Sequence, residues 1–160
     1  MLTKKQLVNK KFNISEFISE QEEDEFDKEE TNNSDGETNV GDFVDMISAL
    51  INSQTQVHVF HLQTESYSEH KALQKYYEGI DALVDGLIES YQGKYDVITQ
   101  YNSVKNEDYK SNEQVIKYFK ALDSMIEKNR KEVKESFIQN QIDTVQELIN
   151  STVYKLRFLK

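Results

Sequence analysis

The sequence predicts an all-α protein whose main part is a four-helix bundle. Proline is absent from all 160 residues, although its usual frequency of ~5% would give about eight. Apolar residues recur at steps of three and four in four separate stretches, which is the spacing of one buried helix face. We therefore expect residues 39–160 to form the bundle and residues 1–38 to form an extended acidic arm.

The arm, residues 1–38, holds most of the negative charge. Residues 1–14 contain four lysines and no acid, whereas residues 15–38 contain eleven acids and one lysine. We expect the arm to be disordered or ordered only by a partner, because so polar a stretch buries too little apolar surface to offset its ordering entropy. It is either a solubilising tail or a docking arm for a protein partner. The apolar anchors of a docking arm would be Phe12, Ile14, Phe17, Ile18 and Phe26.

The first two helices are expected at residues 41–64 and 67–92. One apolar stripe begins at Phe43. The next stripe includes Tyr77 and stops before Gly93, a residue type that often closes a helix in the left-handed conformation. Only a few residues separate the two stripes, so they should form an antiparallel hairpin.

The last two helices are expected at residues 112–129 and 132–157. Ser111 and Asn112 are candidate N-terminal caps. The pair Asn129-Arg130 marks the expected break between the two apolar stripes. These helices should form a second antiparallel hairpin.

Residues 94–111 connect the two hairpins. Their own apolar residues predict a short helix, because a structureless loop of this length is unusual in a compact domain. These residues are Tyr95, Val97, Ile98, Tyr101 and Val104. Two hairpins joined by one long crossover make the ferritin-like form of the four-helix bundle.

The composition argues against several classes of function. The sequence has no cysteine, so disulfides, thiolate metal sites and cysteine nucleophiles are excluded. No apolar run approaches the roughly 20 residues that a membrane-spanning helix needs. The formal charge of −10 repels phosphate, so we expect no nucleic-acid partner. We expect a soluble intracellular protein without a membrane partner.

All three histidines, His58, His61 and His70, fall within thirteen residues. The predicted hairpin brings His61 and His70 near each other across its turn. Imidazoles beside carboxylates can bind a transition metal, but histidines at a bundle end also hydrogen-bond to their neighbours. Here the neighbours would be Glu65, Tyr67 or Glu69. The Glu-x-x-His pairs of di-metal bundles are absent from the sequence.

The run from His61 through His70 to the Asp-x-x-x-Glu pair at 85–89 resembles the first hairpin of the mini-ferritins, the starvation-induced DNA-protecting family. That family has two histidines flanking the first turn and an iron site between two subunits. The resemblance implies a set of candidate metal ligands, namely His58 or His61, His70, Asp85 and Glu89. Four residues after the second histidine, where the family has an aspartate ligand, this chain has Gln74.

The stretches 61–77, 83–93 and 154–159 resemble recurring stretches of small proteins encoded by tailed bacteriophages. This resemblance covers about residues 41–160 and implies a phage origin. We therefore expect a non-enzymatic structural or adaptor protein of a phage particle or of its assembly, located in the virion or the host cytoplasm. Its partners would be proteins, a second copy of the chain among them, and it would need no cofactor.

The alternative is a metal-binding or iron-oxidising mini-ferritin relative that uses iron at an inter-subunit site. Gln74 favours the structural interpretation, because iron prefers hard oxygen ligands and an amide binds far more weakly than a carboxylate.

Overall fold

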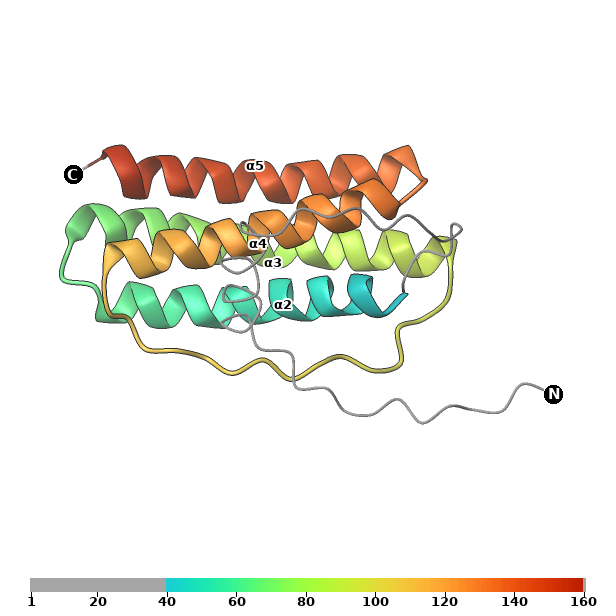
Figure 1. The fold of residues 1–160 in the computed structure, drawn as a ribbon, viewed down its shortest axis with the longest axis horizontal. Helices are drawn as coiled ribbons and strands as arrows, with labels where there is room; N and C mark the ends of the chain where they lie inside the picture. Colours follow the sequence, from blue (N-terminus) through green and yellow to red (C-terminus); the bar gives the residue numbers. More distant parts are fainter. Residues whose placement is uncertain (1–39, 160) are drawn as a thin grey trace, which may run out of the picture.

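The computed structural model describes residues 40–159, which fold into four α-helices without any β-strand in that range. The helices, labelled as in Figure 1, are α2 (Val40–Gln63), α3 (Tyr67–Lys94), α4 (Asn112–Glu132) and α5 (Ser136–Phe158). The expected all-α four-helix architecture is confirmed. The acidic arm lies outside the described residues, as do its five proposed anchors, Phe12, Ile14, Phe17, Ile18 and Phe26.

The chain forms two antiparallel hairpins, α2–α3 and α4–α5, joined by a crossover that runs the length of the bundle (Figure 1). Helix α3 packs against both α2 and α5, and α4 completes the ring by packing against α5 and α2. Each helix therefore has two neighbours and buries one face between them.

The core is a single cluster built from the apolar faces of all four helices. The phenol ring of Tyr76 lies edge-on to that of Phe119, with 4.8 Å between centroids. Ser53 Oγ donates to the Leu50 carbonyl at 2.7 Å, so the Tyr76 hydroxyl is the donor across the 2.8 Å to Ser53 Oγ. The sequence stripe contained Tyr77 and not Tyr76. Tyr76 is fully buried, whereas Tyr77 is partly buried and packs against the edge of the core.

Two predicted helix ends are wrong, and one predicted cap is confirmed. Gly93 lies inside α3, and no described glycine has a positive φ. Asn129 lies inside α4, where its buried side-chain amide donates to the Met125 carbonyl at 2.9 Å. Helix α4 therefore continues to Glu132. Ser111 caps α4 as expected, because its hydroxyl accepts from the Gln114 backbone N–H at 3.2 Å.

The crossover, residues 95–111, contains no helix, so the short helix predicted there is wrong. Polar side chains of α2 hold its backbone instead. The Gln56 side chain donates to the Glu107 carbonyl at 2.7 Å and accepts from the Glu107 N–H at 2.6 Å. Gln63 Oε1 accepts from the Tyr109 N–H at 2.6 Å. Backbone groups that a helix would pair internally are thus paired with α2.

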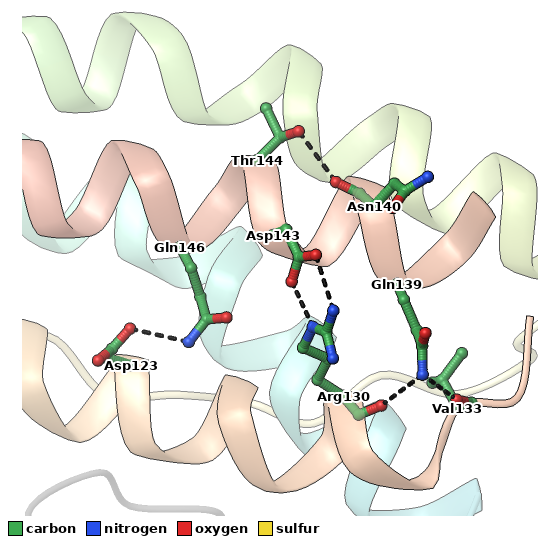
Figure 2. Close-up of polar contacts among 8 residues, drawn as sticks. All are labelled: Asp123, Arg130, Val133, Gln139, Asn140, Asp143, Thr144 and Gln146. Atoms are coloured by element: carbon green, nitrogen blue, oxygen red, sulfur yellow. Dashed lines mark hydrogen bonds and ion pairs between the residues drawn. The ribbon is translucent and has the colours of Figure 1, made fainter. Parts of the chain in front are cut away.

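Polar contacts tie α4 to α5 beside the core (Figure 2). The Arg130 guanidinium donates to both carboxylate oxygens of Asp143, with 2.9 Å between Nη2 and Oδ2. This contact lowers the pKa of the Asp143 carboxyl below its ordinary value. The Gln139 amide closes the turn between the two helices by donating to the Val133 carbonyl at 2.7 Å.

Candidate functional site

The histidines His61 and His70 form a closed clamp across the α2–α3 turn. His61 Nδ1 lies 2.9 Å from the His70 carbonyl oxygen, and His70 Nδ1 lies 3.0 Å from the His61 carbonyl oxygen. A carbonyl only accepts, so both rings carry their proton on Nδ1. The rings stack with 3.6 Å between centroids and 25° between planes. The expected approach of these two residues is confirmed.

The neighbours expected to bond these histidines do not do so. Glu65 and Tyr67 are exposed, and the Glu69 carboxylate bonds to other groups. The partners are instead the two histidine carbonyls, which places the hydrogen bonds between the last turn of α2 and the first turn of α3. The clamp thus joins the two helices directly.

His58 lies beside the clamp and is connected to it through Tyr77. Its exposed ring stacks on Tyr77, with 4.4 Å between centroids, and Tyr77 meets His61 edge-on at 5.1 Å. Four rings therefore pack together at one end of the α2–α3 hairpin. Tyr77, which the sequence pattern assigned to the core, belongs to this cluster.

The Glu69 carboxylate accepts hydrogen bonds from several elements, which the sequence did not predict. Its Oε2 accepts from the Thr64 hydroxyl at 2.7 Å and from the Tyr109 hydroxyl at 2.9 Å. Its other oxygen accepts from the Asn112 amide, which also donates to the Leu156 carbonyl at 3.3 Å. One carboxylate therefore connects the turn between α2 and α3, the crossover and the start of α4. Through Asn112 it is also connected to the end of α5.

A sequence signal for Glu69 did exist. The residues 66–69 read Ser-x-x-Glu, the pattern of a capping box. Ser66 is the N-cap of α3, and its hydroxyl accepts from the Glu69 backbone N–H at 3.4 Å. The Glu69 carboxylate, however, reaches across to the crossover and α4. Burial, followed by the bond to Glu69, raises the pKa of Tyr109 above its ordinary value.

The candidate metal ligands do not converge within one chain. Among residues 40–159, no three His, Asp or Glu side chains form a group that could hold a metal ion. Asp85 and Glu89 follow His70 on the same helix by roughly 22 and 28 Å at 1.5 Å per residue. The stacked planes of His61 and His70 do not direct two in-plane lone pairs at one ion. The donor set of a single chain therefore does not fit an iron centre.

Gln74, at the position of the missing carboxylate, belongs to a chain of surface contacts. Its Oε1 accepts from Lys71 Nζ at 2.7 Å, and its Nε2 donates to Glu78 Oε1 at 2.8 Å. Both ends of the amide are thus used within α3.

The first hairpin also has a shallow groove on its outer side. The volume of the groove is about 240 Å³. Its rim consists of Ile51 and Gln54 from α2 and Asp81, Asp85 and Ile88 from α3. We call this feature the acidic groove. Of the candidate metal ligands, only Asp85 lies in it.

Fold and site together define an all-α four-helix bundle whose first hairpin is closed by a histidine clamp. The chain belongs to the DUF5856 family, a family of unknown function, whose model matches residues 61–156. The match begins at His61 and includes His70, so it contains the whole clamp. No curated protein and no solved structure matches the chain. No helix within residues 40–159 is long and apolar enough to cross a membrane.

Proposed function

We propose that this protein is a non-enzymatic structural or adaptor protein, a component of a phage particle or of its assembly. The observation that carries the proposal is the clamp itself. His61 and His70 use their Nδ1 protons and their ring faces to hold α2 against α3. These two histidines, the side chains best suited to catalysis or metal binding, thus stabilise the packing of α2 on α3.

The rest of the polar network supports the same function. Glu69 binds the crossover and α4 to the first turn, and Gln56 fixes the crossover to α2. The result is a braced bundle suited to presenting surfaces to other proteins. In this proposal residues 1–38 dock on a protein partner, and the bundle is the scaffold that carries them.

The finer parts of the proposal rest on the sequence. The phage origin, and with it a location in the virion or the host cytoplasm, follows from the resemblance of residues 41–160 to tailed-phage proteins. The ferritin-like assignment is supported by the order of hairpin, long crossover and hairpin. The iron-oxidising alternative would bring the candidate metal ligands together between two chains, and Gln74 in place of a carboxylate counts against it.

The test is incorporation of the protein into particles of the phage that encodes it, measured by quantitative mass spectrometry. We would compare the full chain with a deletion of residues 1–38 and with a matched variant, Phe17→Ser/Ile18→Ser/Phe26→Ser, which keeps every charge. The full chain should be incorporated in a fixed ratio, and both variants should be lost. Their thermal transitions should stay nearly unchanged.

Salt gives a second measure of the same contact. Association through the acidic arm should weaken as ionic strength rises, because exposed charges are screened over about 10 Å at 0.1 M salt. Equal incorporation of the deletion variant would reduce the arm to a solubiliser. Absence of the full chain from both particles and assembly intermediates would overturn the structural function.

A further inference from the structure

The acidic groove combines an apolar floor with a negative rim. Its floor is formed by Leu50, Ile80 and Val84, which are buried, while Ile51 on the rim is 46% exposed. Asp81 and Asp85 are both exposed and lie one helical turn apart on α3. Within residues 40–159 neither carboxylate has a hydrogen bond or an ion pair, and like charges at this spacing repel each other.

No base on α2 offsets these carboxylates, because Val40–Gln63 contains neither lysine nor arginine. The charges that face the groove are therefore of one sign. A partner that fits must bring cations together with apolar side chains.

The end of α5 has this chemistry. Residues 148–160 contain three bases and no acid, and three large apolar side chains are exposed there: Tyr154 at 54%, Phe158 at 59% and Leu159 at 48%. We call these three residues, with Lys155 and Arg157, the C-terminal patch. The Arg157 guanidinium lies 4.8 Å from the centroid of the Phe158 ring, so base and aromatic surface are adjacent.

Lys155 of the patch lies near a further base on α3, Lys75. Burial and the nearby Lys75 lower the pKa of Lys155 below its ordinary value. Lys155 Nζ has the neutral Ser151 hydroxyl as a neighbour at 3.2 Å. An added carboxylate would be favourable beside these two ammonium groups.

We propose that the acidic groove of one molecule binds the C-terminal patch of a second copy of this chain. Charge selects this head-to-tail pairing. Groove against groove would oppose carboxylates, and patch against patch would oppose bases, whereas groove against patch pairs Asp81 and Asp85 with Lys155 and Arg157. The contact also buries the apolar residues of the groove rim against the exposed aromatic rings of the patch.

The contact leaves a free groove at one end of the pair and a free patch at the other. Helix α5 packs on α3 and α4, while the groove opens between α2 and α3, so the two surfaces lie on different sides of the bundle. Heterologous contacts of this kind continue into rings or open chains. This inference goes beyond the docking arm, because it uses residues of the bundle alone and stands even if the arm proves to be a solubiliser.

The test uses sedimentation velocity on the full chain, over concentrations up to about 0.5 mM, where weak contacts become populated. Two variants each break one surface: Asp81→Lys/Asp85→Lys for the groove and Lys155→Glu/Arg157→Glu for the patch. The unmodified chain should form dimers and larger species as concentration rises, and less so at high salt. Each variant alone should remain monomeric.

Mixing the two variants is the decisive step. One keeps its patch and the other keeps its groove, and the two substituted surfaces are complementary to each other. An equal mixture should therefore form dimers and larger species in which the two variants alternate. A chain carrying all four substitutions should associate again with the charges exchanged. A control variant, Asp96→Lys/Glu147→Lys, makes the groove variant's charge change at exposed sites elsewhere and should behave as the unmodified chain.

Three results would overturn the proposal. The unmodified chain could remain monomeric at every concentration. Association could persist in both surface variants, which would indicate a contact elsewhere. The mixture could contain only monomers, although each variant keeps the thermal transition of the unmodified chain.

Discussion

His61 and His70 each hold the carbonyl of the other, so removing one ring leaves a backbone acceptor without its donor. We expect His70→Ala to lower the free energy of unfolding by about 1–3 kcal/mol through the lost bonds and ring packing. Urea unfolding measures this. The comparison is His58→Ala, which removes a stacking contact with Tyr77 but no hydrogen bond and should cost less, about 0.5–1 kcal/mol. Equal losses for the two variants would contradict the clamp.

The Arg130–Asp143 pair predicts a pH dependence. Arg130 lowers the pKa of Asp143 in the folded protein, so the pair stabilises the fold above the ordinary Asp pKa of about 3.9. That contribution disappears as the pH falls through the lowered folded-state value. Thermal melts between pH 7 and pH 2 should show a shallower acid loss for Asp143→Asn than for the unmodified chain. If the melting temperatures of the two proteins fall in parallel as the pH is lowered, the pair does not stabilise the fold.

The site could be predicted from sequence only in part. The approach of His61 and His70 followed from the register of the first hairpin, which the apolar stripes set. Their hydrogen-bond partners did not follow, because each Nδ1 meets a carbonyl nine residues away and the turn geometry decides that contact. The function of Glu69 was hidden for the same reason, since its partners come from the crossover and α4.

At the scale of the elements, the crossover depends on side chains of α2. Gln56→Ala should lower the free energy of unfolding by about 1–3 kcal/mol, because it removes both hydrogen bonds between this side chain and the Glu107 backbone. Hydrogen exchange at the Glu107 amide should become faster, while exchange in the middle of α3 should change little. The control is Thr55→Ala, at an exposed neighbouring position. Unchanged exchange at Glu107 would show that Gln56 does not hold the crossover.

The four helices were predictable because periodic apolar spacing is a local property. Their ends were harder. Gly93 and Asn129 are residue types that often end helices, but α3 continues past Gly93 to Lys94, and α4 continues past the buried Asn129 to Glu132. The helix predicted in the crossover is absent because its apolar residues do not form a buried face. Tyr95, Val97 and Tyr101 are exposed, and amide side chains of α2 bind the crossover backbone instead.

For the whole molecule, the charge of −10 predicts weak interaction with nucleic acid. Phosphate is repelled by most of the chain, and only two short basic segments, residues 1–14 and 148–160, oppose this. We expect no complex with duplex DNA at physiological salt in a fluorescence anisotropy titration. A complex of micromolar or tighter affinity would contradict this prediction.

The central proposal is that the histidines of this bundle hold helices together and do not bind a metal. The most direct measurement is a long-range ¹H–¹⁵N NMR spectrum of the histidine side chains in the full chain, recorded before and after adding one equivalent of ferrous ion without oxygen. We predict that His61 and His70 are both protonated on Nδ1 and that the ion leaves their signals in place. Protonation on Nε2 in either ring, or selective loss of these two signals at one iron per chain, would contradict the account.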